Sequence, residues 1–132
     1  MTKFDFKDGN GPVPAHKHPN GGGWVADTAT VADTAYVGPD AKVYGSAWVF
    51  DNARVFENAR VFENAGVYEN AGVYGDAKVY GNARVFGNAT VSGNATVYGD
   101  DAIYLTKIYD DKEIGGPEKD RIFINGKWYV EE

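Results

Sequence analysis

Residues 52–66 read NARVFENARVFENAG, in which one six-residue unit is written twice and begun a third time. The repeat extends far beyond this stretch, because valine occurs at every sixth position from Val25 to Val97 without a slip. An alanine stands two residues before each following valine, from Ala29 to Ala95. Repetition at a fixed short period is typical of solenoids, in which each unit buries its apolar side chains against its neighbours.

The order of residues within one unit predicts a short strand followed by a corner. Strand alternation places Ala59 and Val61 on one side of the chain, and Arg60 and Phe62 on the other. The two remaining positions hold Gly, Glu or Asp followed mostly by Asn or Asp, and Gly, Asn and Asp tolerate the positive φ of a sharp turn. We therefore expect a three-sided coil with valine and alanine inside, in which residues eighteen apart stack about 4.8 Å above one another.

Stacking at this period also predicts a column of amides at one corner. Asn52, Asn70 and Asn88 fall eighteen residues apart. Stacked amides stabilise cross-β assemblies. We expect a similar amide ladder to join the coils at this corner.

The Val-x-x-x-Ala-x register of residues 25 to about 102 resembles the hexapeptide-repeat family of left-handed parallel β-helices, which includes acyltransferases and the gamma class of carbonic anhydrases. The resemblance implies an all-β fold, a left-handed parallel β-helix of about four triangular coils. It also implies self-association, as a trimer. The run PVPAHKHPNGGGWVADTA is similar to segments that precede such repeats in uncharacterised bacterial and phage proteins, which implies a phage or bacterial origin.

The repeat divides the chain into an N-terminal cap and loop over residues 1–24, a β-helix over 25–102, and a C-terminal strand and hairpin cap over 103–132. KFDFKDG is predicted to form a strand in the first part. The regular coils are expected to end at Gly99-Asp100-Asp101, where aspartate takes the position of an alanine. Asn125-Gly126 between apolar segments predicts a type I′ hairpin in the last part.

Charge and composition exclude several classes of partner. The 132 residues carry a net charge of −6, whereas nucleic acids and anionic membranes bind basic surfaces. There is no cysteine for a disulfide or a thiolate metal site, no apolar core of signal-peptide length and no apolar run that could span a bilayer. We expect a protein of the cytoplasm, which would be the host cytoplasm or the virion for a phage protein.

An enzyme is the function that the resemblance first suggests. By that resemblance, an acyltransferase would use a histidine base near a subunit interface, and a carbonic anhydrase three histidines around a metal ion. The two histidines of this chain, His16 and His18, precede the repeat. A solenoid without imidazole or thiol groups offers no general base near neutral pH, so we assign no catalytic or cofactor-binding residue to it.

His16 and His18 form the one candidate metal site. In an extended segment, residues i and i+2 project to the same side, so the two imidazoles could share a metal ion with Asp5, Asp8 or Asp27 as a third ligand. The alternative is that PAHKHPNGGG is a cap on the first coil, with Trp24 covering the end of the core.

Aromatic and basic side chains form two outward columns that are candidates for binding a partner. Outward Phe and Tyr rings would stack as ladders, and exposed rings favour self-association. Beside one ladder stand three cations that could dock an acidic partner. The predicted partner-binding residues are Lys42, Arg60, Lys78, Tyr44, Phe62 and Tyr80.

We therefore interpret the sequence as a non-catalytic structural scaffold or protein-interaction module that self-associates. One alternative is an acyltransferase-like or metal-dependent enzyme with a site at a subunit interface that uses His16 or His18. The other is an inhibitor or sequestering protein that binds a host factor.

Overall fold

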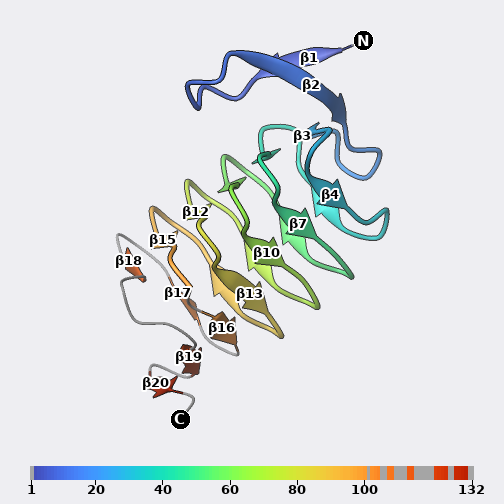
Figure 1. The fold of residues 1–132 in the computed structure, drawn as a ribbon. Helices are drawn as coiled ribbons and strands as arrows, with labels where there is room; N and C mark the ends of the chain where they lie inside the picture. The colour runs from blue at the N-terminus through green and yellow to red at the C-terminus, as the bar shows by residue number, and fades with distance from the viewer. Residues whose placement is uncertain are drawn as a thin grey trace.

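The computed structural model describes residues 2–100 and the backbone of the later strands at 102–104, 107–108, 113–114, 121–124 and 127–130. Beyond residue 100, only the side chain of Ile108 is described. The described residues form a β-solenoid of about four turns, a rod of stacked coils with the two ends of the chain at opposite ends (Figure 1). They contain no helix and hence no membrane-spanning helix.

Each coil contributes one strand to each of three sheets that form the sides of the rod. The first sheet has eight strands, namely β1 (Lys3–Asp5), β2 (Pro12–Lys17), β3 (Trp24–Ala26), β6 (Lys42–Val43), β9 (Arg60–Val61), β12 (Lys78–Val79), β15 (Thr96–Val97) and β18 (Glu113–Ile114). The second sheet has seven, namely β4 (Thr30–Val31), β7 (Trp48–Val49), β10 (Gly66–Val67), β13 (Arg84–Phe86), β16 (Ala102–Tyr104), β19 (Arg121–Ile124) and β20 (Lys127–Val130). The third has five, namely β5 (Tyr36–Val37), β8 (Arg54–Val55), β11 (Gly72–Val73), β14 (Thr90–Val91) and β17 (Lys107–Ile108).

The register of the parallel strands follows the sequence repeat. Val43 lies opposite Val61, and Val61 lies opposite Val79, so equivalent residues of neighbouring coils are eighteen positions apart. The other two sheets show the same spacing, as in the pairs Val49–Val67 and Val55–Val73. The predicted parallel, three-sided coil is confirmed.

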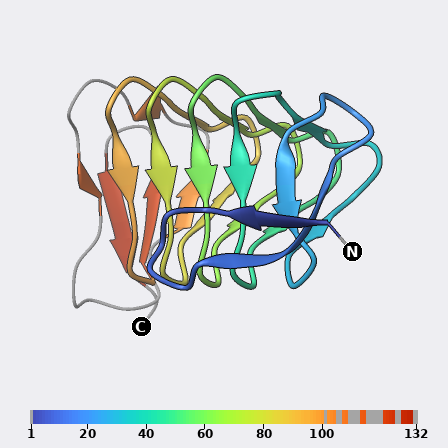
Figure 2. The same cartoon turned by 90° about the horizontal axis from the view of Figure 1, so that it is seen from above.

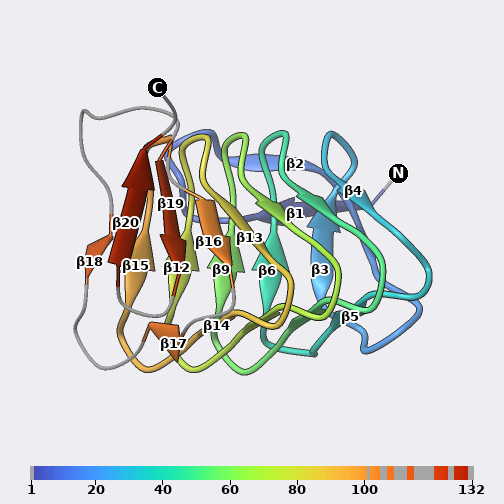
Figure 3. The ribbon, with the colours of Figure 1, turned by 90° about the horizontal axis from the view of Figure 1, so that it is seen from below.

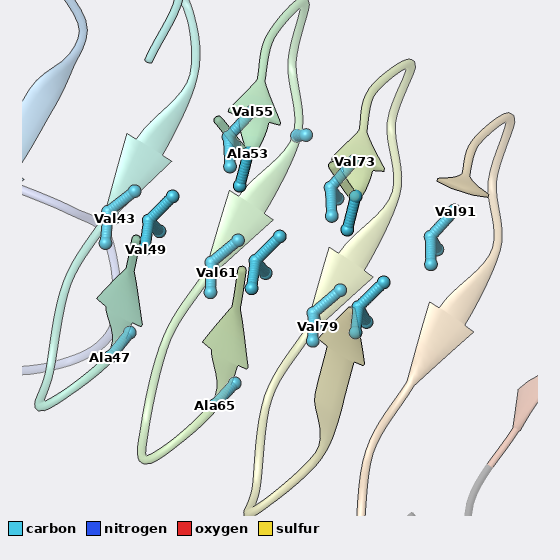
Figure 4. Close-up of a cluster of buried hydrophobic side chains, with 14 of the residues drawn as sticks. Val43, Ala47, Val49, Ala53, Val55, Val61, Ala65, Val73, Val79 and Val91 are labelled. Atoms are coloured by element: carbon cyan, nitrogen blue, oxygen red, sulfur yellow. The ribbon is translucent and has the colours of Figure 1, made fainter. Parts of the chain in front are cut away.

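Valine and alanine fill the interior of the rod (Figure 4). Every repeat valine from Val37 to Val97 and every repeat alanine from Ala35 to Ala95 has no exposed surface. Burying a valine side chain stabilises a fold by about 1.5–3 kcal/mol, so the repeated core dominates the stability of the coils. At the first coil the core is less complete, because Val31 is only partly buried.

The corners turn at the first of their two residues. From residue 45 to residue 99, this position has φ between about 58° and 81°, and it holds glycine in six corners and a carboxylate residue in four. The carboxylate residues are Asp51, Glu57, Glu63 and Glu69. The predicted sharp turn at each pair is thus made by the first residue, which is glycine, aspartate or glutamate, whereas Asn58 and its equivalents stand second in the corner.

Each of the four corner carboxylates is held by the next coil. Glu63 accepts a hydrogen bond from Gly81 N at 3.0 Å, and Asp51 accepts one from Glu69 N at 3.1 Å. The hydrogen bonds described at the Asn52–Asn70–Asn88 corner come from the backbone, such as Asn52 N to Glu69 O at 3.0 Å and Asn70 N to Gly87 O at 2.9 Å. Backbone and carboxylate groups thus join the corners where we expected stacked amides.

The N-terminal segment forms a hairpin on the outside of the first sheet. β1 pairs antiparallel with β2, and β2 pairs antiparallel with β3. The hairpin runs across the outer side of the coils (Figure 2). Phe6 of the hairpin stacks on Tyr44 of the second coil. Trp24 faces outward against Phe4 at 4.7 Å, so it does not cover the end of the core as expected.

Parallel pairing continues beyond the strict sequence repeat. β16 pairs parallel with β13, β17 with β14, β18 with β15, and β19 with β16. Position 102 therefore marks the end of the repeat pattern, whereas the stacking continues with shifted spacing, as in Val91 opposite Ile108. β19 and β20 form an antiparallel pair beside β16 at the C-terminal end (Figure 3). The predicted turn at 125–126 lies outside the described residues.

Candidate functional site

A column of five aromatic rings follows the first sheet. Phe62 stacks on Tyr44 at 4.9 Å and on Tyr80 at 4.9 Å, and Tyr98 follows Tyr80 at 5.4 Å. Phe6 of the hairpin adds a ring at the other end, 4.7 Å from Tyr44. The predicted ladder of Tyr44, Phe62, Tyr80 and Tyr98 is confirmed as a geometric arrangement.

Tyr44 is not open to a partner, although we predicted it as a binding residue. Its side chain is only 4% exposed because the hairpin ring of Phe6 covers it. Burial raises the pKa of Tyr44, and a hydrogen bond to Arg60 together with the charge of Arg60 opposes that rise. Of the three aromatic residues predicted to bind a partner, Phe62 and Tyr80 therefore stay partly exposed.

The three predicted cations lie in one column on the first sheet. Lys42 is in register with Arg60, and Arg60 is in register with Lys78. No carboxylate of the described residues forms an ion pair with any of them. Lys78 is exposed and the other two are partly exposed.

The second sheet carries an aromatic cluster that contains the most open ring. Trp48 stacks on Tyr68 at 5.1 Å and lies 5.4 Å from Phe50. The indole passes over Gly66, where an added Cβ would be 2.2 Å from Trp48 Cζ2. Phe50 stays outside the stack and is 37% exposed.

The third sheet carries an aromatic pair beside a cavity. Phe56 stacks on Tyr74 at 4.8 Å. On the N-terminal side of Phe56, a cavity of about 330 Å³ is lined by Tyr36, Arg54 and Phe56. Arg54 is exposed and forms no ion pair with a described carboxylate. This pocket was not foreseen, although Gly38 in place of an aromatic residue signals the missing ring below Phe56.

Two further cavities lie under the hairpin loop. One of about 330 Å³ has apolar walls that include Phe6, Val13 and Tyr44, and one of about 250 Å³ extends to Phe62 and Glu63. Asp8 and Asn10 of the loop line both. The loop is held by its own hydrogen bonds, including Asn10 N to Asp8 Oδ1 at 3.1 Å.

The structure places the two histidines in different surroundings. His16 Nδ1 lies 2.7 Å from Asp27 Oδ1, and both of these side chains are half-exposed. His18 is buried, with Nε2 2.8 Å from the carbonyl oxygen of Ala35. The expected strand alternation does not reach His18 because β2 ends at Lys17. Within residues 2–100, no group of three or more His, Asp or Glu side chains could hold a metal ion.

The segment after His18 covers the open edge of the third sheet. Val37 N donates to the carbonyl oxygen of Asn20 at 3.0 Å, and Gly23 N donates to the carbonyl oxygen of Val37 at 3.0 Å. The side-chain amide of Asn20 also donates to Ala35 O at 3.1 Å. Residues 18–23 therefore occupy a fixed position on the first coil.

One family model, described as the YdcK beta solenoid repeat, matches residues 77–93. The matched segment covers β12, β13 and β14, one strand from each sheet. No curated protein and no solved structure gives a significant match to the chain. The family model and the stacked coils together identify a β-solenoid repeat protein, a fold consistent with a structural or interaction module.

Proposed function

We propose that this protein is a non-catalytic structural scaffold that self-associates through the outer faces of its solenoid. The interior offers no room for chemistry, because its valine and alanine columns have no exposed surface. Any binding therefore takes place on the sheets, the corners or the ends. The rings of the second and third sheets are the features there that resemble an interface.

The observation that carries the proposal is the position of Phe50. It is the most exposed large apolar side chain of the described residues, and it lies next to Trp48 on a flat sheet face. Aromatic residues are enriched in the buried centres of protein interfaces, whereas charged residues are depleted there. A second copy would remove this ring from water.

A closed ring of three copies is the assembly that we propose, because the sequence resembles trimeric hexapeptide-repeat proteins. Sedimentation equilibrium at several protein concentrations tests it. We expect a mass of three chains of 14.3 kDa each at the higher concentrations. One chain mass at every concentration would refute self-association.

Binding of an acidic protein to the first sheet is a second candidate function. The observation that favours it is the Lys42–Arg60–Lys78 column, whose cations stand in register without an ion-paired carboxylate among residues 2–100. Like charges in neighbouring strands repel one another, and an acidic partner would relieve that repulsion.

Substituting Arg60 and Lys78 by glutamate tests this second function, with an acidic peptide as the probe. We expect the substitutions to weaken binding at least tenfold, and high salt to weaken binding to the wild-type protein, since exposed charges are screened. The same two substitutions to glutamine should have a smaller effect. Equal binding by all three proteins would exclude this column.

A further inference from the structure

Aromatic rings follow the repeat valines of the second coil on all three sheets, but small residues take the same position in the first coil. The small residues are Ala26, Ala32 and Gly38, and the rings above them are Tyr44, Phe50 and Phe56. Tyr44 and Phe56 therefore each have one face with no neighbour from their own column, whereas Phe50 lies outside its column, beside Trp48. The stacking of rings elsewhere in the columns shows that a further ring would fit there.

On the first sheet, the chain fills this position itself. Phe6 of the hairpin stacks on Tyr44 at 4.7 Å with an angle of 20° between the rings, and Tyr44 is only 4% exposed. The hairpin does not reach the equivalent places on the other two sheets. There, Phe50 stays 37% exposed, and the cavity of Tyr36, Arg54 and Phe56 stays open beside Gly38.

We propose that the pocket of Tyr36, Arg54 and Phe56 binds the Phe50–Asp51 pair of a second copy. This inference rests on the proposed self-association and names the surfaces that perform it. The Phe50 ring would stack on Phe56 of the neighbouring chain, as Phe6 stacks on Tyr44 within one chain. The Asp51 carboxylate would pair with Arg54.

The charges and shapes of the two surfaces match. The pocket has two aromatic walls and one cation, and Arg54 has no ion-paired carboxylate among residues 2–100. The Phe50–Asp51 pair offers an exposed ring with a carboxylate on the next residue. Asp51 Oδ2 accepts a hydrogen bond from Glu69 N, which fixes the carboxylate and leaves its other oxygen for Arg54. An arginine–carboxylate pair beside stacked rings is typical of the strong contacts in interfaces.

The position of the two surfaces on the rod also suits a closed assembly. Phe50 follows β7 and Arg54 begins β8, so both lie in the second coil, on adjacent faces around the corner at residues 51–52. A contact between two different surfaces is heterologous, and rotation about an axis parallel to the rod closes such contacts into a ring. That rotation keeps equivalent coils at the same height, so the Phe50 side chain must extend toward the first coil of the neighbouring chain to reach the free face of Phe56.

Mixing two variants tests the pairing of these surfaces. Phe50→Ser removes the inserted ring and keeps the pocket, whereas Arg54→Glu alters the pocket and keeps the ring. We expect each variant alone to associate at least tenfold more weakly than wild type, because central aromatic and arginine side chains carry most of the binding energy in interfaces. An equimolar mixture should form one-to-one dimers, because one intact pocket and one intact ring remain.

Lys3→Glu is the matched control, since it reverses a charge at an exposed position of β1, on the first sheet. It should keep the wild-type mass. Thermal unfolding followed by circular dichroism checks that every variant is folded. An unchanged mass for Arg54→Glu, or a mixture that stays monomeric, would overturn the proposed contact.

A covalent test reports directly which surfaces meet, because a disulfide traps the contact when it forms. The chain has no cysteine, so Phe50→Cys and Tyr36→Cys each introduce a single thiol. We expect oxidation of the mixed chains to give the mixed disulfide, at least tenfold more than a mixture of Lys3→Cys and Tyr36→Cys chains. Equal yields would contradict the contact even if the wild-type protein associates, whereas a monomeric wild-type protein would refute self-association itself.

Discussion

The residue type at a position of this repeat depends on contacts with the neighbouring coil as well as on the strand or corner that contains it. Glu63 adopts a φ of 59°, a conformation that glycine and asparagine adopt more readily, and its carboxylate accepts the N–H of Gly81. The hydrogen bond to a charged acceptor offsets the backbone strain, since such bonds contribute about 1.5–3 kcal/mol. This explains why glutamate can take a position of the repeat that glycine holds in most other corners.

Two glycines of neighbouring strands provide a matched comparison at the residue scale. Gly66 and Gly72 both replace the basic or polar residue before a repeat valine, but an added Cβ would lie 2.2 Å from Trp48 at Gly66 and 3.9 Å from the nearest atom at Gly72. We expect Gly66→Ala to destabilise the fold by about 1–3 kcal/mol, because the indole must move. Gly72→Ala should be neutral or stabilising by up to about 1 kcal/mol.

Urea unfolding of the two alanine variants measures this difference, and tryptophan fluorescence reports the displacement of Trp48. Both substitutions add one methyl group to a two-residue strand, so strand propensity cancels between them. Equal stabilities for the two variants would show that Trp48 does not occupy the space above Gly66.

At the scale of elements, the N-terminal hairpin has the role of an additional layer on the first sheet. Its ring Phe6 extends the aromatic column, and its strand β2 covers the edge of β3. The sequence predicted a strand at KFDFKDG and a cap formed by the segment before the repeat. It did not predict that the hairpin packs on the outer face, because stacking of Phe6 on Tyr44 is a contact between residues far apart in the chain.

The buried hydroxyl of Tyr44 makes the attachment of this hairpin sensitive to alkaline pH. Burial raises the pKa of Tyr44, so the folded state holds the phenol proton more tightly than the unfolded state does. The resulting stabilisation is fully present below the unfolded pKa of about 10 and is lost as the pH rises through the folded value. We expect the unfolding free energy of the wild-type protein to fall more steeply between pH 9 and 11 than that of Tyr44→Phe.

Urea unfolding at a series of pH values provides the comparison. At pH 8, Tyr44→Phe should cost about 1 kcal/mol through loss of the hydrogen bond to Arg60. Tyr74→Phe, which removes the hydroxyl of a ring stacked on Phe56 on the third sheet, is the control for the loss of a tyrosine hydroxyl. Parallel pH profiles for wild type and Tyr44→Phe would contradict the assigned role of the Tyr44 hydroxyl.

At the scale of the whole molecule, the coil could be predicted from the sequence because one short pattern repeats without interruption. The period of six predicted the strands, the inward columns and the register. Val61 and its equivalents are buried in the interior and stand in register with one another, as predicted. Beyond residue 100 the pattern fades, and the continued parallel pairing depends on strands such as β17 that have no repeat signature.

The candidate binding surfaces were only partly predictable for the same reason. The Lys42–Arg60–Lys78 column follows from the period alone. The pocket at Tyr36, Arg54 and Phe56 depends on an aromatic residue that the first coil lacks, and the burial of Tyr44 depends on the hairpin. Both are departures from the repeat, and their consequences appear only in three dimensions.

The mass and thickness of the particle in solution test the central claim, that this rod works by binding copies of itself along its sides. Small-angle X-ray scattering measures both quantities in one experiment. The account predicts a forward scattering of three chain masses and a cross-section wider than that of a single rod. A thin particle of one chain mass at millimolar concentration would contradict it.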